Sequence, residues 1–373
     1  MTPASEPEAG GAPARPRVDQ ALPTFSYGDA IGNHVLALRA ILRRAGHASE
    51  IFTLACHPRV RSEARLWREY PAAGEPGRVL VMHFSIGSPM AGQFARVAAR
   101  RVLIYHNVTP AGFARGVNRR MERECREGRE QLAQLAAATE LAIGDSEYNR
   151  LELEELGYRR TAVVPILVDL PAHDAQPPVR ELLRRWGDGR TNILHVGRLA
   201  PNKRIDDLVR AFHVYRRLDP GSRLFLVGTD SGLENYASAV RDLVAGLGTP
   251  DVHFVGHVDF RELCTWYRLA DLYLTMSEHE GFCVPLLEAM HFGVPIVAYA
   301  STAVPWTLGG AGLLVREKRW GEVAELMRLA VADRGVRAHL VAAGKERLAA
   351  FGPRRIEEAF LGTLRDAGVV PPA

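Results

Sequence analysis

The sequence predicts an α/β protein with two doubly wound parallel sheets, because of its length, its alternating periodicity and a break near its middle. At 373 residues, 47% apolar and 24% charged, the chain is too long for one compact core and suits two domains. Short apolar runs alternate with longer amphipathic stretches, as expected of parallel strands joined by crossover helices. A polar, Pro-containing stretch after residue 166 divides this pattern into two series.

The first series makes up a predicted domain of residues 19–166. Residues 1–18 are rich in Pro, Ala, Gly and Glu and almost lack large apolar side chains, so we expect a disordered tail. Amphipathic helices are expected between six predicted strands, which are Ala21–Phe25, Glu50–Leu54, Arg78–His83, Arg101–His106, Glu140–Gly144 and Thr161–Ile166.

The second series follows a predicted linker, residues 167–189, and makes up a domain of residues 190–352. Doubly wound sheets bind ligands beyond the carboxyl ends of their strands, so two facing sheets predict a site in a cleft between them. An amphipathic helix is expected at Pro353–Ala367, and the predicted strands are Asn192–Val196, Arg223–Val227, Val252–Val255, Asp271–Thr275, Val294–Tyr299 and Gly312–Val315.

Composition excludes several classes of protein. A net charge of +4 over this length lacks the concentrated positive field of a nucleic-acid binder, so nucleic acid is not an expected partner. The four cysteines form no Cys-x-x-Cys pair, which argues against a zinc knuckle and a disulfide framework. With no apolar run near the roughly 20 residues that span a bilayer and no signal-peptide pattern, we expect a cytoplasmic protein.

The most informative segment is Ser277–Met290, SEHEGFCVPLLEAM, which follows a predicted strand. Glu280 and Glu288 in it are separated by seven residues, and Pro285 suits the first turn of a helix. A tight turn of Gly281, Phe282 and Cys283 would aim its amides at an anion. Two carboxylates flanking an anion fit a sugar nucleotide, with Glu280 on the sugar hydroxyls, Glu288 on the ribose and the diphosphate between them.

A second cluster lies after the strand that ends at Val196. Gly197 is followed by Arg198 and, five residues later, by Lys203, one of only three lysines in the chain. Arg can chelate phosphate oxygens through two N–H groups and Lys can act as a point charge, so the pair suits a diphosphate. No Asp-x-Asp pair stands at a strand end to hold a divalent ion, so no metal or other cofactor is expected.

Together these segments resemble the signature of glycosyltransferase family 4, retaining enzymes of the GT-B fold with two Rossmann-like domains. The resemblance extends to the segments 293–298 and 310–315. It implies that Arg198 and Lys203 bind the donor diphosphate, Glu280 the transferred sugar and Glu288 the ribose. It also implies that backbone groups near Val258 read the nucleobase, and that the last helix, within residues 353–373, crosses back to the first domain.

In the first domain the resemblance points to the loop after the first strand and to the end of the fourth. Gly28 and Gly32 match a glycine-rich loop beneath the donor phosphates, where glycines let the backbone approach a ligand. His106 matches a histidine that contacts the transferred sugar, with His83 as the competing choice and a structural role for either as the alternative. The acceptor-side residues are then expected to be Asp29, Asn33 and Asn107.

Three features depart from the family pattern or leave alternatives open. Cys283 stands where the family usually has glycine, and adds a side chain beside the phosphate site. Trp306 replaces a usual Glu and either reshapes the pocket or packs locally. The Arg-rich segment Phe113–Leu135 has charges of both signs at helical spacing, which indicates a solvated helix, with an anionic membrane face as the alternative.

The resemblance therefore implies a metal-independent, retaining hexosyltransferase acting from a nucleoside diphosphate sugar, with GDP-mannose slightly favoured over UDP-hexoses. The acceptor would be a hydroxyl on a glycan, a lipid-linked molecule or a small molecule, in cell-surface polysaccharide assembly. A lipid-linked acceptor would place the protein at the inner face of the membrane through peripheral contact. The alternatives are a sugar-nucleotide epimerase and a catalytically silent relative that binds a sugar nucleotide or a partner.

Overall fold

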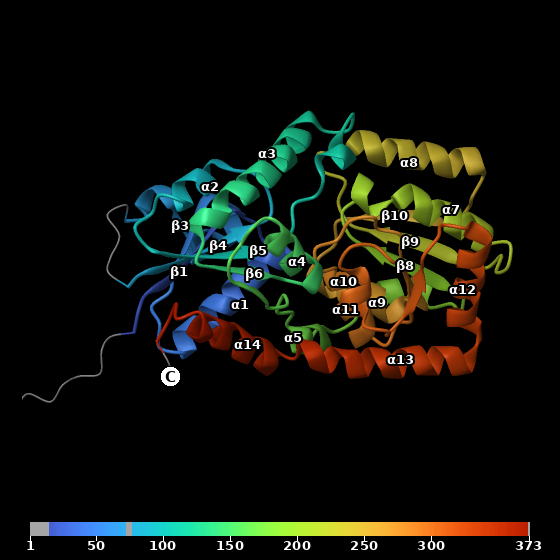
Figure 1. The fold of residues 1–373 in the computed structure, drawn as a ribbon. Coiled ribbons are helices and arrows are strands. Elements are labelled where there is room, and N and C mark those ends of the chain that lie inside the picture. The colour runs from blue at the N-terminus through green and yellow to red at the C-terminus, as the bar shows by residue number, and fades with distance from the viewer. Residues whose placement is uncertain (1–14, 72–76, 372–373) are drawn as a thin grey trace, which may run out of the picture.

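The computed structural model describes residues 15–71 and 77–371, which form two lobes, each around its own parallel sheet (Figure 1). The first sheet has seven strands in the order β3-β2-β1-β4-β5-β6-β7, and the second has six in the order β10-β9-β8-β11-β12-β13. In each, the chain starts in the middle, builds outward to one edge and then crosses to the other side. The strand order therefore reverses between β1 and β4 and between β8 and β11.

The first lobe packs helices on both faces of its sheet. In β4 (Val79–Phe84), Val79 and Val81 face α1 (Ala30–Arg44), whereas Leu80 and Met82 face α2 (Pro89–Phe94) and α3 (Arg119–Leu135), as the period of two requires. The other elements of this lobe are β1 (Val18–Phe25), β2 (Ile51–Cys56), η1 (Pro58–Glu63), β3 (Arg65–Leu66), η2 (Trp67–Glu69), β5 (Arg100–Tyr105), η3 (Ala111–Ala114), η4 (Ala136–Ala138), β6 (Leu141–Gly144), α4 (Glu147–Glu155) and β7 (Thr161–Val163).

The second lobe repeats this layering. In β9 (Arg223–Val227), Leu224 and Leu226 pack with α7 (Ile205–Tyr215) and α12 (Trp320–Ala332), and Phe225 packs on the other face with α9 (Phe260–Leu269). The remaining elements of this lobe are β8 (Asn192–Val196), η5 (Pro201–Lys203), α8 (Glu234–Leu247), β10 (Val252–Gly256), β11 (Leu272–Thr275), α10 (Val284–His291), β12 (Ile296–Tyr299), α11 (Val304–Leu308), β13 (Leu313–Val315), α13 (Arg334–Leu348) and η6 (Ala349–Phe351).

Twelve of the thirteen strands fall on predicted strands. The tail was predicted to extend to residue 18, and this limit was wrong. Val18 opens β1 with no exposed surface, and the Arg15 guanidinium donates to the Ala45 carbonyl oxygen, so residues 15–18 belong to the fold. Residues 1–14 lie outside the described residues. The strand that the sequence did not predict, β3, has only two residues, too few for a period of two to be visible.

The segment 167–189 is more ordered than the prediction of an irregular linker. It contains two short helices, α5 (Leu170–Asp174) and α6 (Arg180–Trp186). Trp186 packs against Phe225 and Trp266 at ring-centroid distances of 4.9 and 6.4 Å, which attaches α6 to the second lobe. The Pro and polar residues of the stretch therefore mark helix starts, where Pro is tolerated because its missing N–H has no helical partner.

The end of the chain returns to the first lobe. Figure 1 shows α13 running beneath the second lobe and α14 (Pro353–Asp366) continuing beneath the first. Ile356, Phe360 and Leu364 of α14 are buried with Val18 and Leu38 of the first lobe. This apolar contact packs α14 against the first lobe.

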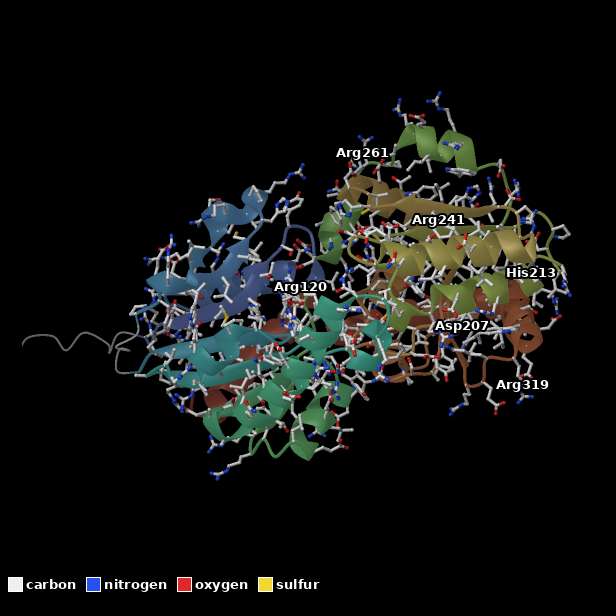
Figure 2. All side chains as sticks on the ribbon, turned by 90° about the horizontal axis from the view of Figure 1, so that it is seen from above. Arg120, Asp207, His213, Arg241, Arg261 and Arg319 are labelled. Atoms are coloured by element: carbon white, nitrogen blue, oxygen red, sulfur yellow. The ribbon has the colours of Figure 1, made fainter. Side chains whose placement is uncertain are left out.

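The Arg-rich segment forms α3 from Arg119 onward, with a buried face and a charged one. Cys125 and Leu132 pack into the first lobe, while Arg120 pairs with Glu124 and Arg123 with Glu127 across one helical turn. Figure 2 shows Arg120 on the first lobe, away from Asp207 and Arg241 of the second. Within the described residues, every helix is too short or too polar to cross a bilayer.

Candidate active site

The strand-end loops of the second lobe meet at its topological switch point. Leu272 of β11 lies opposite Ile193 of β8, so the segments that follow these two strands are neighbours. The loop after β8 is held against the end of the neighbouring strand β9, because the Gly197 amide donates to the Val227 carbonyl oxygen. Ligands of doubly wound sheets bind at this position.

Gly228, which the sequence analysis missed, makes this edge compact. A Cβ on Gly228 would lie 1.9 Å from the Gly197 carbonyl oxygen, so only glycine lets the two loops touch. The Gly228 amide donates in turn to the Gly256 carbonyl oxygen of β10. Val258, two residues further on, is half-buried against the second lobe. A strand ending in Gly is the only sequence signal for residue 228.

Lys203 and Glu280 form a direct ion pair at this edge. The Lys203 ammonium donates to both Glu280 carboxylate oxygens, at 2.7 and 2.6 Å, and the Glu280 side chain is 8% exposed. Burial disfavours the ammonium charge, but the carboxylate beside it raises the pKa of Lys203. The structure therefore joins the two segments that the sequence assigned to one site, and holds a cation where a donor diphosphate is expected.

Arg198, by contrast, is exposed. Its guanidinium donates to the Ser231 carbonyl oxygen at 2.9 Å, and among the described residues no carboxylate pairs with it. The positive charge of Arg198 is close enough to Lys203 to lower the Lys203 pKa, and so it opposes the larger effect of Glu280. The two cations therefore lie at one edge of the sheet, one paired and one open to a ligand.

Gly281 brings the two lobes into contact. A Cβ on Gly281 would lie 2.5 Å from the His106 carbonyl oxygen and 2.8 Å from the Asn107 Cβ, so glycine is required here. The Ser146 hydroxyl donates to the Gly281 carbonyl oxygen at 2.7 Å from the same side. Where the sequence predicts a cleft, the carboxyl edges of both sheets therefore touch.

The turn continues into α10 through a backbone that favours glycine. Cys283 has φ 73°, in the left-handed region, and this explains why the family usually has glycine at this place. Its thiol is buried, and that burial, together with nearby Glu280, raises the pKa of Cys283 well above its ordinary value. Phe282 is buried too, and its carbonyl oxygen accepts from the Thr307 hydroxyl at 2.6 Å.

Both oxygens of the second glutamate are engaged. The Tyr267 hydroxyl donates to Glu288 Oε2 at 2.6 Å, and His173 Nε2 lies 3.3 Å from Oε1. The Glu288 side chain is 10% exposed, whereas the sequence predicts a carboxylate that faces the cleft. It is therefore less open to a ligand than predicted. Neither Tyr267 nor His173 carried a sequence signal, because each lies far from Glu288 along the chain.

A half-buried salt-bridge network supports the turn from behind. Lys318 donates to Asp207 Oδ2 and Glu278 Oε1, both at 2.7 Å, and Arg204 donates to the same Glu278 oxygen at 2.8 Å. Asp207 belongs to the second lobe in Figure 2. The loop after β12 adds Thr302, whose hydroxyl oxygen accepts from the Glu280 amide at 2.9 Å. These contacts fix the backbone that presents Glu280.

In the first lobe, the predicted glycine-rich loop opens α1. Asp29 caps the helix by accepting from the Gly32 amide at 2.5 Å, and burial raises the pKa of Asp29. Gly28 has φ 78°, in the left-handed region that favours glycine, and a Cβ there would meet nothing within 4 Å. Gly32 differs, since a Cβ there would lie 2.7 Å from the Ser26 carbonyl oxygen. The close packing around the Asp29 cap therefore explains why residue 32 is glycine. Asn33, the next residue, is exposed.

His106 and His83 lie in one buried hydrogen-bonded chain. His106 Nδ1 lies 2.7 Å from Asp145 Oδ2, and His106 Nε2 lies 2.9 Å from His83 Nδ1. His83 continues the chain to Gln20 Oε1 at 3.0 Å. Both nitrogens of each ring are therefore used inside the first lobe, which favours the structural alternative. What His106 presents to the second lobe is its carbonyl oxygen, against Gly281.

Two other residues singled out from the sequence also have packing roles. Asn107, at φ 74°, donates to Asn149 Oδ1 at 2.8 Å and so turns its amide into the first lobe. Trp306 lies 6.2 Å from Phe282 and 6.1 Å from Phe351 between ring centroids, which favours local packing. It contacts the turn of the site through Phe282.

Fold and site together define a GT-B protein, with two doubly wound lobes that meet at the carboxyl edges of their sheets. The model of the family "Glycosyl transferases group 1" matches residues 184–347. The D-inositol 3-phosphate glycosyltransferase of Frankia alni is 31% identical over 317 residues, which are 79% of this chain and 76% of that protein. The chain belongs to this family, glycosyltransferase family 4. It is therefore a retaining-family hexosyltransferase that uses a nucleotide sugar.

Other similarities are more distant or cover less of the chain. The GDP-mannose-dependent alpha-(1-6)-phosphatidylinositol monomannoside mannosyltransferase of Mycobacterium tuberculosis is 32% identical over 49% of this chain and 50% of its own. The solved structure of an alpha,alpha-trehalose 6-phosphate synthase from Burkholderia multivorans has a TM-score of 0.73 at 14% identity, covering 95% and 99% of the two chains. Anabaena HepE, solved with UDP and glucose, has a TM-score of 0.72 at 17% identity, covering 94% and 100%. These two structures support the fold.

Proposed function

We propose that the protein transfers mannose from GDP-mannose, with UDP-hexoses as the second choice, to a hydroxyl acceptor in the assembly of a glycan or cell-surface polysaccharide. The second lobe binds the donor, and the first lobe binds the acceptor. No metal ion takes part. The observation that carries the proposal is the Lys203–Glu280 ion pair beside exposed Arg198, at the switch point of the second sheet.

Each of these groups has a part in the proposed reaction. The diphosphate of the donor lies against Arg198 and Lys203, and Lys203 shares its three N–H donors between Glu280 and the phosphate oxygens. Glu280 accepts from hydroxyls of the transferred sugar. As the bond to the sugar breaks, the two cations stabilise the charge that develops on the leaving diphosphate.

Retention follows if the acceptor attacks from the face that the diphosphate leaves. The leaving diphosphate takes the proton of the acceptor hydroxyl, so the protein needs no separate base on that face. Glu280 is unsuited to covalent attack in this arrangement, because it is held by Lys203 and placed against the sugar hydroxyls. The Glu288 carboxylate already accepts a hydrogen bond from Tyr267, and it accepts a second one from a ribose hydroxyl with the lone pairs that remain.

Preference for GDP-mannose is supported by the names of similar proteins. The Mycobacterium tuberculosis relative is GDP-mannose-dependent, and a mannosylfructose-phosphate synthase of Agrobacterium fabrum is 34% identical over 34% of this chain. UDP is bound in Anabaena HepE, at 17% identity, which keeps UDP-hexoses as the second choice.

A thermal-shift series with GDP, UDP, ADP and dTDP tests the donor. A ligand at 100 times its dissociation constant stabilises the folded state by about 2.7 kcal/mol, and GDP should give the largest shift. Slow release of GDP from GDP-mannose without an acceptor would separate the enzyme from a silent binding protein. Stabilisation by UDP alone would exclude the GDP-mannose assignment, and an epimerised sugar nucleotide as product would exclude transfer.

A further inference from the structure

Tyr27, His57 and Arg59 form an exposed cluster in the first lobe that none of the roles above uses. We refer to these three residues as the rim cluster. Tyr27 is 55% exposed, its ring stacks on His57 at 6.0 Å between centroids, and the Arg59 guanidinium lies 5.1 Å from the Tyr27 ring centroid. Because Phe25 of β1 pairs with Cys56 of β2, the loops after these strands are adjacent. The rim cluster therefore lies at the carboxyl edge of the first sheet.

The tautomer of His57 follows from one hydrogen bond. The Arg59 backbone N–H donates to His57 Nδ1 at 3.2 Å, so Nδ1 is an acceptor and the ring proton lies on Nε2. The residue that carries this N–H, His57, is exposed. His57 thus offers its Nε2–H as a donor to a ligand.

Arg59 keeps its charge free for a ligand. The carboxylates of this region are taken by other arginines, since Glu63 pairs with Arg39 and Glu69 with Arg65. Within residues 15–71 and 77–371, Arg59 has no carboxylate partner, and its side-chain contact is the Tyr27 ring. An aromatic face orients a guanidinium without using its N–H donors, so the group is ordered and unneutralised.

The rim cluster lies within reach of the point of transfer. The strands run in the order β2-β1-β4-β5, so at about 4.8 Å per strand the end of β2 is about 14 Å from the end of β5. His106, at the end of β5, meets Gly281 next to Glu280. Asp29, two residues after Tyr27, is close enough to His106 for the two to interact electrostatically. A sugar of one or two rings with a charged substituent spans this interval.

We propose that the rim cluster binds an anionic group, phosphate or carboxylate, on the sugar acceptor. The Arg59 fork and His57 Nε2–H donate to its oxygens, and Tyr27 holds Arg59 in place. The inference rests on the proposed function, since an acceptor exists only for a transferase. It adds the chemical class of the acceptor and the residues that select it.

Calorimetric titration tests the subsite apart from turnover. The protein, saturated with the nucleoside diphosphate that it binds best, is titrated with D-glucose 6-phosphate, D-fructose 6-phosphate and D-glucuronate, and with neutral D-glucose and D-fructose. At least one anionic sugar should bind about tenfold or more tightly than its neutral parent. The phosphates and the carboxylate distinguish the two anions. Equal binding of every anionic sugar and its parent overturns the proposal.

Two variants of Arg59 and a matched control assign the effect. Arg59→Ala should weaken binding of the anionic sugar about tenfold or more, and Arg59→Lys should lose less, because it keeps the charge without the fork. Arg96 is exposed on the same lobe, and it lies before β5 and therefore at the opposite edge of the sheet. Arg96→Ala makes the same charge change there, and an equal loss in this control overturns the proposal.

The outcome for the proposed function is read separately. Nucleotide binding depends on the second lobe, so the absence of nucleotide binding and transfer in the unmodified protein rejects the proposed function, and the sugar titrations are then made on the protein without nucleotide. Conversely, nucleotide binding and transfer with neutral sugars alone would keep the proposed function and reject the rim cluster as an anion subsite.

Discussion

His173 Nε2 lies 3.3 Å from Glu288 Oε1, and this contact joins the segment between the lobes to the carboxylate assigned to the ribose. His173 Nδ1 lies 2.8 Å from the Asp169 carbonyl oxygen, which can only accept, so Nδ1 carries a proton. A carboxylate on the other nitrogen is satisfied when His173 is the imidazolium. Burial opposes that charge, but the hydrogen bonds to Glu288 and Asp169 outweigh it and raise the pKa of His173.

The stability that this contact provides should fall as the pH rises. A folded-state pKa above the ordinary value of 6.5 means that the contribution is complete below pH 6.5 and is lost as the pH passes the folded-state pKa. His173→Gln should therefore cost about 1 to 2 kcal/mol near pH 6 and less near pH 9. Thermal unfolding of both proteins across this range measures the difference.

His339→Gln is the matched control for the pH series. His339 is exposed on α13 and has no hydrogen bond or ion pair within the described residues, so its replacement should leave the pH dependence unchanged. A constant difference between the unmodified protein and His173→Gln from pH 6 to pH 9 would contradict a charged His173. The GDP affinity of His173→Gln then reports whether the contact also positions Glu288.

A methyl group at Gly281 should separate the lobes. Gly281→Ala places a Cβ 2.5 Å from the His106 carbonyl oxygen, which is backbone and has little room to move. We expect a loss of about 1 to 3 kcal/mol in stability or a larger radius of gyration in small-angle scattering, and lower activity in either case. Gly362→Ala is the control, because a Cβ there meets nothing within 4 Å. An unchanged melting temperature, radius and activity in Gly281→Ala would mean that the contact is absent in solution.

Much of the fold was predictable from periodicity, since parallel strands buried on both faces form apolar runs that end at glycine or polar residues. Asn192–Val196 and Arg223–Val227 were predicted with the limits that the structure has. Elements too short to repeat a pattern were not, as β3 and α5 show. The Pro residues around α5 were interpreted as breaks, although Pro171 lies in the first turn of that helix.

The candidate site was predictable where it depends on local segments and not where it depends on distant partners. Lys203 and Glu280 lie on adjacent strand ends, so a pair could be inferred from the two motifs. The partners of Glu288 are 21 and 115 positions away in the sequence, and no residue spacing predicts contacts at such separations. His106 shows the converse, because a histidine at a strand end gives no sign that His83 and Asp145 occupy its ring nitrogens.

Activity should survive removal of divalent ions. In the proposed function, Arg198 and Lys203 supply the positive charge that a metal would otherwise bring to the diphosphate, and both are held by contacts within the protein. Transfer is measured after exhaustive dialysis against EDTA, with and without added Mg²⁺ or Mn²⁺. Loss of activity with EDTA that either ion restores would contradict metal independence.

The two glutamates should separate kinetically, because Glu280 is assigned to the transferred sugar and Glu288 to the ribose. Glu280→Gln should lower kcat about 100-fold or more, since it removes a charge that orients the reacting sugar and leaves Lys203 without its partner. Glu288→Gln should mainly raise the donor KM, because ribose contacts are similar in the ground and transition states. Steady-state kinetics with varied donor distinguishes the two. A covalent sugar ester on Glu280, seen by intact-mass measurement with a slow fluorinated donor, would show that Glu280 is a nucleophile and overturn this assignment.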